Sequence, residues 1–368
     1  MWLSRRPLLA LFLIWAATTA IDMDKAFHID DAFHLKAAQW IEHHPLRPMS
    51  GLVNWGNSPQ PISDFNQPPG FFYLVAATGH VFGYAEWPMH ALRALFSLLA
   101  ILCFHRLAKH RSPEHALFLT ALLALGPAFL VNQGLMTDVP LLAMQLLFFN
   151  LLLVPGTMRP DLRYALAGLA LGGAMSIKYT TLPLLVLFPV ALLLLRERRW
   201  LATAFIPLAL IACWSFWNLR EFGSVHLLDR QGGDPSPRGI FVRALAFLVC
   251  AGAMAPFTPV FGALFPSAKR WLRNSMVMLF ILSALFTAFS YAGIIPEPVS
   301  DQTLRTVFTL NGLLLAVMAL RGLPRRMEKA NAEPWILVGW AGTLALFVVG
   351  FAPMMATTHR QPVLPPVL

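Results

Sequence analysis

The chain has 368 residues, of which 57% are hydrophobic and 12% are charged, and its mean hydropathy is +0.61. A soluble domain carries about 25% charged residues, so this composition excludes an ordinary soluble enzyme and predicts a polytopic membrane protein. The formal net charge is +10, but no basic and aromatic motif for nucleic acid accompanies it, so we expect Lys and Arg to mark cytoplasmic loops. The cysteines all lie in apolar runs and predict neither a disulfide nor a zinc site.

About eleven apolar runs approach the ~20 residues that a helix needs to cross a membrane. This pattern predicts an all-α polytopic fold, with residues 1–368 as a single transmembrane domain and 22–88 as its first extracytoplasmic loop. The first run resembles a signal peptide, but many runs follow it, so we expect an uncleaved first helix. The expected spans lie near 7–21, 89–106, 115–135, 139–154, 163–177, 180–195, 200–217, 239–265, 275–294, 304–320 and 334–355.

The run 71–84 is too short to be one of these spans, because a helix of that length reaches only about 21 Å. We expect it to lie at the membrane surface and to end at Gly83. With the N-terminus in the cytoplasm, the loops rich in Lys and Arg then all fall on the cytoplasmic side, as the positive-inside rule requires. The same topology brings several polar residues to the opposite face, namely Asp30, Asp31, Asp64, Asp138, Lys178, Arg220 and Arg360.

Two adjacent acids, Asp30 and Asp31, open an amphipathic helical pattern over 31–44. A carboxylate near a membrane surface and beside a second acid can be tuned into a general base. The alternative is that one of the acids caps the helix, and both interpretations can hold together. Because His28 and His34 flank the pair, a metal site is a further alternative, although this spacing is no strong metal signature.

Further candidates follow along the chain on the same expected face. Asp138 stands in MTDVPL, at the junction of two spans, and Lys178 stands in SIKYTTLP, in a tight turn between two others. Lys178 suits a lipid phosphate, or it is a lysine that only extends to the membrane surface. Arg220 and Arg360 present the same two alternatives. Together these cations and acids predict a site where an anionic group meets a base.

The order of these motifs resembles a known family. After one span come DDAFHLKAAQWI, then HPLRPMSGLVNWGNSPQPISDFNQPPGFFYL, FGYAEWPMHALRAL, MTDVPL, SIKYTTLPLL, WSFWNLREFG and HRQPVLPP. The pattern is similar to that of the GT-C membrane glycosyltransferases, in the family of the protein O-mannosyltransferases and aminoarabinose transferases with its bacterial members. The similarity extends over nearly the whole chain.

The resemblance implies an inverting glycosyltransferase that moves a sugar from a polyprenyl-phosphate carrier to an acceptor hydroxyl or amine. It implies that Asp30 is the general base and that Asp138 is a second catalytic acid. The expected substrate- and lipid-phosphate-binding residues are Asp31, His34, Lys178, Tyr179, Arg220 and Arg360. The chain departs from the family at Gln67, where a basic residue often precedes Pro68-Pro69, and at Gln361, where a tyrosine often follows the arginine.

We expect the protein to lie in the bacterial plasma (inner) membrane, with its N-terminus in the cytoplasm and its active site in the periplasm. Its expected partners are the lipid bilayer, the polyprenyl-phosphate sugar donor and a glycan, lipid or protein acceptor, with no nucleic acid. No cofactor is expected, and a divalent metal remains open. Trp40, Trp55 and Trp87 can stack on sugars or anchor the loop at the interface.

Two alternatives to an active transferase remain. One is a lipid-sugar transporter or flippase, which the gathering of charges at one face disfavours, since transport sites usually lie near mid-membrane. The other is a family member that binds the lipid-linked sugar without catalysis. Because the sequence stops soon after HRQPVLPP, we also expect a short version of a longer architecture.

Overall fold

The computed structural model describes residues 6–21, 23–54, 58–65, 67–131, 134–229, 233–254, 270–326 and 331–350. Within these ranges the regular elements are helices, apart from one antiparallel ribbon of β1 (Leu52–Val53) and β2 (Gln60–Pro61). The predicted all-α class is therefore confirmed. The chain forms two compact units, one from Met1–Leu125 and Asn132–Arg230 and the other from Gly126–Val131 and Gln231–Leu368.

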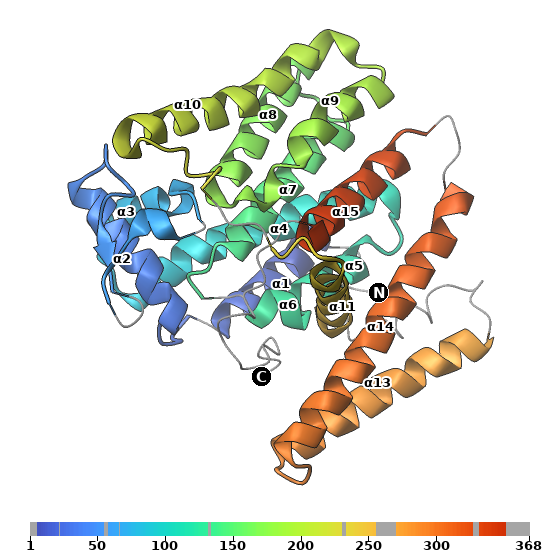
Figure 1. Ribbon diagram of the computed structural model, residues 1–368. Coiled ribbons are helices and arrows are strands. Elements are labelled where there is room, and N and C mark those ends of the chain that lie inside the picture. Colours follow the sequence, from blue (N-terminus) through green and yellow to red (C-terminus); the bar gives the residue numbers. More distant parts are fainter. Residues whose placement is uncertain are drawn as a thin grey trace. The chain divides into compact units, whose positions relative to one another are not determined.

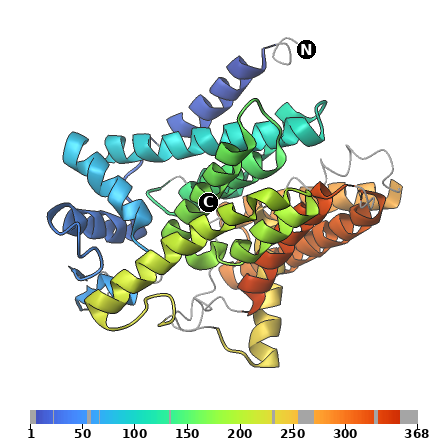
Figure 2. The same ribbon diagram turned by 90° about the horizontal axis from the view of Figure 1, so that it is seen from above.

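The first unit contains the long N-terminal loop and the helices that support it. Helices α4, α7 and α8 pack in that order, α10 packs on α8, α1 packs on α4 and α5, and α2 packs on α3 (Figures 1 and 2). The elements are α1 (Pro7–Ala20), α2 (Ile29–His43), η2 (Ile62–Asp64), α3 (Gly70–Phe82), α4 (Glu86–Arg111), α5 (Ala116–Ala124), α7 (Asp138–Leu153), α8 (Pro160–Ile177), η3 (Tyr179–Thr181), α9 (Leu184–Leu194), η4 (Arg198–Ala204) and α10 (Phe205–Phe222).

In the second unit, α14 packs against α11 and α13, and α15 packs against α11. Its helices are α6 (Pro127–Val131), α11 (Pro237–Met254), α13 (Arg270–Tyr291), α14 (Glu297–Arg326) and α15 (Glu333–Gly350). Two glycines allow α11 and α14 to approach closely: a Cβ on Gly252 would overlap the Phe308 carbonyl, and one on Gly312 would overlap the Leu248 carbonyl. Asn311 Nδ2 donates to the Gly252 carbonyl at 2.8 Å across the same crossing.

Six helices in the described part of the chain are long and apolar enough to cross a membrane. They are Glu86–Arg111, Arg198–Phe222, Pro237–Met254, Arg273–Tyr291, Pro298–Leu320 and Glu333–Gly350. Four shorter apolar helices are Pro7–Ala20, Gly70–Phe82, Asp138–Leu153 and Tyr179–Leu194. The predicted class of integral membrane protein is thus confirmed, whereas the number of spans stays a prediction.

Proline and glycine explain where the helices depart from the expected spans. The run expected to span at 115–135 is not one continuous helix: α5 ends at Ala124, and Pro127, which has no backbone N–H to continue a helix, opens α6. Whether it crosses the membrane stays a prediction. The expected helix at 71–84 is α3, which ends before Gly83, whose φ is 81°. Its position at the membrane surface stays a prediction.

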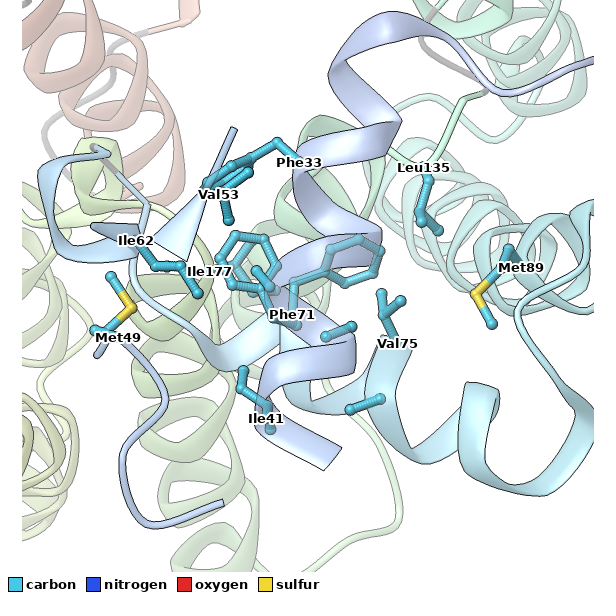
Figure 3. Packing of buried hydrophobic residues seen from close by; sticks show 14 of the residues in the cluster. Phe33, Ile41, Met49, Val53, Ile62, Phe71, Val75, Met89, Leu135 and Ile177 are labelled. Atoms are coloured by element: carbon cyan, nitrogen blue, oxygen red, sulfur yellow. The ribbon is translucent and has the colours of Figure 1, made fainter. Parts of the chain in front are cut away.

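The first loop has a hydrophobic core of its own. Figure 3 shows Phe33 and Ile41 from α2 beside Phe71 and Val75 from α3, with Ile177 from the end of α8. The irregular stretch between α2 and α3 adds Met49, Val53 and Ile62. Full burial of one such side chain contributes about 1.5–3 kcal/mol, so this core attaches the loop to the end of α8.

Candidate active site

The expected helix at the acidic pair is α2, and it begins at Ile29 with His28 as its N-cap. Asp30 and Asp31 are therefore in the first turn, and the interpretation of either acid as the cap itself is wrong. Asp31 Oδ2 accepts a hydrogen bond from the His28 backbone N–H at 2.8 Å, while His28 Nδ1 accepts from the Asp30 N–H at 3.3 Å. Both carboxylates lie where the helix dipole favours negative charge.

The two neighbouring acids have very different surroundings. Asp31 is only 1% exposed, and its Oδ1 has no hydrogen-bond partner among the described residues. The Asp31 carboxylate packs against Gly134, where a Cβ would lie 3.1 Å from Oδ1. The side chain of Asp30 is 36% exposed, and its Oδ2 lies 3.5 Å from His28 Nδ1. Of the pair, Asp30 is the carboxylate that a ligand can reach.

Asp138 and Lys178 form an ion pair where α7 begins and α8 ends. Lys178 Nζ donates to Asp138 Oδ1 at 2.9 Å. Asp138 is the first residue of α7, and Lys178 is the first residue after α8. Because α7 and α8 pack against each other, two residues that the sequence separates widely meet at one end of the helices. Both side chains remain partly exposed, at 38% and 30%.

His34 is a buried histidine one turn after Asp30 and Asp31 on α2, and burial lowers its pKa below the ordinary value. The hydrogen bond with Gln67 and the charges of the two acids raise this pKa, whereas the Lys178 ammonium lowers it. His34 Nε2 lies 2.9 Å from Gln67 Oε1. Gln67, which precedes Pro68-Pro69, thus contacts His34.

The tyrosine next to Lys178 has partners that the sequence did not indicate. The Tyr179 hydroxyl accepts from Trp214 Nε1 at 2.8 Å and lies 2.8 Å from His226 Nδ1. His226 Nε2 lies 2.9 Å from the Phe65 carbonyl oxygen. Trp214 belongs to the motif WSFWNLREFG, but nothing in the sequence singles out His226. The predicted contact of Tyr179 with a lipid phosphate stays a prediction.

An apolar cavity of about 410 Å³ lies beside this tyrosine. Its walls come from the start of α3, the end of α8 and the inner face of α10. Ser176, which lines it, is two residues before Lys178, and Trp214, which also lines it, is bonded to Tyr179. The lining residues are Pro45, Leu46, Pro68, Pro69, Gly70, Tyr73, Gly172, Met175, Ser176, Leu210, Ile211, Trp214 and Trp217.

The structure does not place every predicted site residue near Lys178 and the cavity. Arg220 is exposed in the last turn of α10 and forms no ion pair with another described residue. Arg360, like Gln361 beside it, lies outside the described residues. No group of three or more His, Cys, Asp and Glu side chains with metal-binding geometry occurs in the ranges that the structure describes. The metal alternative gains no support from the His28 and His34 spacing.

The tryptophans expected to contact sugars differ from one another. Trp40 stacks on His44 at a centroid distance of 3.8 Å and donates from Nε1 to the Arg47 carbonyl at 2.7 Å. Trp87 is 60% exposed at the start of α4, and Trp55 lies outside the described residues. Among the described tryptophans, Trp214 has the closest connection to the Lys178 turn.

Comparison with known proteins agrees with the sequence and the fold. Residues 66–217 match the family described as dolichyl-phosphate-mannose-protein mannosyltransferase. The structure is similar to that of ArnT from Cupriavidus metallidurans in the apo state, with 16% identity, a TM-score of 0.53, and coverage of 95% of this chain and 78% of ArnT. A second ArnT structure from the same organism, bound to undecaprenyl phosphate, gives 14% identity, 93% and 77% coverage and a TM-score of 0.43. No curated protein matches the chain.

The matched segment runs from the residue before Gln67 through the ends of α7 and α8 to Trp217, so it contains Asp138, Lys178 and most of the cavity wall. Residues 66–217 therefore match the dolichyl-phosphate-mannose-protein mannosyltransferase family, and the fold of the chain is similar to that of ArnT in the apo state.

Proposed function

We propose that the protein transfers a sugar from a polyprenyl-phosphate carrier to an acceptor hydroxyl or amine, with inversion, at the non-cytoplasmic face of the bacterial inner membrane. One observation supports this most strongly. Asp30 is a partly exposed carboxylate, both Asp30 and Lys178 act electrostatically on the buried His34, and Ser176, two residues before Lys178, lines an apolar cavity. A base, a cation and an apolar groove are what a lipid-phosphate sugar donor requires.

The donor lipid fits the side of the site that contains Lys178. In this proposal the apolar cavity accepts the first isoprene units, and the ammonium of Lys178, two residues after the lining residue Ser176, binds the phosphate. Asp138 holds that ammonium in place through its hydrogen bond of 2.9 Å. The family description names a dolichyl phosphate, which is a polyprenyl carrier of this chemical class.

The transfer step needs no metal-bound nucleotide. The acceptor hydroxyl attacks the anomeric carbon from the face opposite the phosphate, forming one C–O bond while the bond from that carbon to the phosphate oxygen breaks. Asp30 takes the acceptor proton, and the lipid phosphate leaves with the electron pair. Lys178 stabilises the negative charge that grows on the phosphate.

The experiment that tests the base is Asp30→Asn in the full-length protein. We expect kcat for sugar transfer to fall by about 10²–10⁴, because general base catalysis contributes a factor of that size. The thermal unfolding temperature should stay close to that of the wild type, since the Asp30 side chain is partly exposed. Asp24→Asn changes an exposed acid of the same loop and is the matched control. Full activity of Asp30→Asn would overturn the assignment.

A further inference from the structure

A buried series of hydrogen bonds includes Tyr179, the residue that follows Lys178. Trp214 Nε1 lies 2.8 Å from the Tyr179 hydroxyl, this hydroxyl lies 2.8 Å from His226 Nδ1, and His226 Nε2 lies 2.9 Å from the Phe65 carbonyl oxygen. The four residues come from α10, from the turn after α8, from the connection after α10 and from the stretch before α3. One imidazole therefore joins segments that are separated by up to 161 positions in sequence.

The donors and acceptors in this series of hydrogen bonds can be assigned from the groups at its two ends, the Trp214 indole and the Phe65 carbonyl. An indole N–H can only donate, and a backbone carbonyl can only accept. His226 therefore donates from Nε2 to Phe65. With its hydrogen on Nε2, the imidazole presents Nδ1 as an acceptor for the Tyr179 hydroxyl, which in turn accepts from Trp214. Tyr179 is 6% exposed and His226 is 3% exposed, so bulk water is excluded from this series of hydrogen bonds.

These hydrogen bonds join elements that line the cavity. Trp214 is part of the cavity wall that α10 supplies. Phe65 lies three residues before Pro68, which also lines the cavity together with Pro69. Tyr179 opens the short 3-10 turn η3, and its hydroxyl is fixed on both sides by Trp214 and His226. Lys178 is bonded to this tyrosine through one peptide link.

We propose that His226 is a positioning residue for the donor lipid, because through Tyr179 it holds the turn that carries the Lys178 ammonium. This inference rests on the proposed function, in which Lys178 binds the phosphate of a polyprenyl carrier. His226 itself contacts neither the sugar nor the phosphate. Substitution of His226 should therefore change the affinity for the lipid, whereas the rate of the transfer step depends on Asp30.

Two substitutions distinguish the hydrogen bond that His226 forms through Nδ1 from the one that it forms through Nε2. The amide of His226→Asn can replace Nδ1 and keep an acceptor for Tyr179, but it is too short to reach Phe65. The longer side chain of His226→Gln can replace Nε2 and keep the contact with Phe65, but it leaves Tyr179 without its acceptor. Each variant loses one buried hydrogen bond, so the two should lower the unfolding temperature by similar amounts. They are matched controls for each other.

The measurement is binding of undecaprenyl phosphate to the purified full-length protein in detergent, followed by kcat and KM for transfer. We expect His226→Gln to weaken binding and raise KM about tenfold, the size of effect that loss of one buried hydrogen bond produces, with kcat within about twofold. His226→Asn should stay within about threefold of the wild type in both binding and KM. Tyr179→Phe should reproduce the His226→Gln effect, and the double variant should be no weaker than either alone.

The outcomes distinguish this inference from the proposed function. If the wild type binds undecaprenyl phosphate and all variants bind it equally well, the positioning role is overturned while the donor assignment stands. Losses that follow the unfolding temperature in both His226→Asn and His226→Gln would also overturn it, because a structural role affects both alike. A wild type without affinity for the lipid would overturn the donor assignment, and the positioning role with it.

Discussion

Lys178 and Asp138 lie 2.9 Å apart and are the point where the C-terminal end of α8 meets the N-terminal end of α7. Their side chains are about one-third exposed, so each charge is both paired and open to a ligand. The ion pair fixes the orientation of the Lys178 ammonium and still leaves it accessible to an anionic ligand. This relationship is the basis of the first prediction.

Lys178→Met should raise KM for a polyprenyl-phosphate donor by about 10- to 100-fold, because a hydrogen bond to a charged group contributes about 1.5–3 kcal/mol. The exposed Lys36 of α2 is the control, and Lys36→Met should leave KM unchanged. Initial rates over a range of donor concentrations measure both. A Lys178→Met enzyme with the wild-type KM would show that the phosphate binds elsewhere.

His34 makes stability depend on pH. Burial holds its folded-state pKa below the ordinary value of 6.5, so the unfolded chain binds more protons between the two values. The stability from neutral His34 is fully present above pH 6.5 and is lost as the pH falls from there towards the folded-state pKa. His34→Gln should therefore lose less stability than the wild type over this range. Thermal unfolding at a series of pH values tests this, and parallel curves would contradict it.

Gly70 allows α3 to begin against the end of α8. A Cβ on Gly70 would overlap both the hydroxyl and the backbone carbonyl of Ser176, so Gly70→Ala should destabilise the protein by about 1–3 kcal/mol. A Cβ on Gly342 in α15 would have no neighbour within 4 Å among the described residues. Gly342→Ala should be neutral or stabilising. Thermal unfolding in one detergent compares the two variants, and equal unfolding temperatures would be inconsistent with the close contact.

Gly312 should be equally intolerant of a side chain in the second unit. Its Cα faces the Leu248 carbonyl across the α11–α14 crossing, where a Cβ would overlap that oxygen. Gly312→Val should separate the helices, break the hydrogen bond from Asn311 to Gly252 and destabilise the unit by about 1–3 kcal/mol or more. Proteolysis of detergent-solubilised protein should show faster cleavage within 237–326. Unchanged cleavage would contradict the tight crossing.

Cysteine labelling tests the orientation that the positive-inside rule predicts. In a background without Cys103, Cys213 and Cys250, Lys36→Cys should react with a membrane-impermeant thiol reagent added to the outside of spheroplasts. Lys109→Cys, at the exposed end of α4, should react only after lysis. The reverse labelling would invert the topology and remove the argument for an extracytoplasmic site.

Local patterns were enough to predict most of the helices and the shared face of Asp138 and Lys178. The amphipathic repeat predicted α2 within two residues, and the length of the apolar run predicted α3. The charge distribution predicted that Asp138 and Lys178 share a face, and the structure pairs them. These features depend on residues close in sequence or on the simple alternation of membrane spans.

Contacts between distant segments could not be predicted in this way. His226 reaches Phe65 across 161 positions, and His34 reaches Gln67 across 33, with no periodic signal to connect either pair. The different burial of Asp30 and Asp31 depends on how the loop core places α2 against Gly134. Such details come from tertiary packing, which one sequence does not encode in any local pattern.

The cap formed by His28 and Asp31 also shows how two identical neighbours acquire different roles. Successive residues on a helix point about 100° apart, so the point at which α2 begins decides which acid turns inwards and which stays accessible. An insertion before His28 would leave this arrangement intact, whereas an insertion between His28 and Asp30 would rotate the pair relative to its cap. The register of α2 relative to its cap therefore decides which of the two acids a ligand can reach.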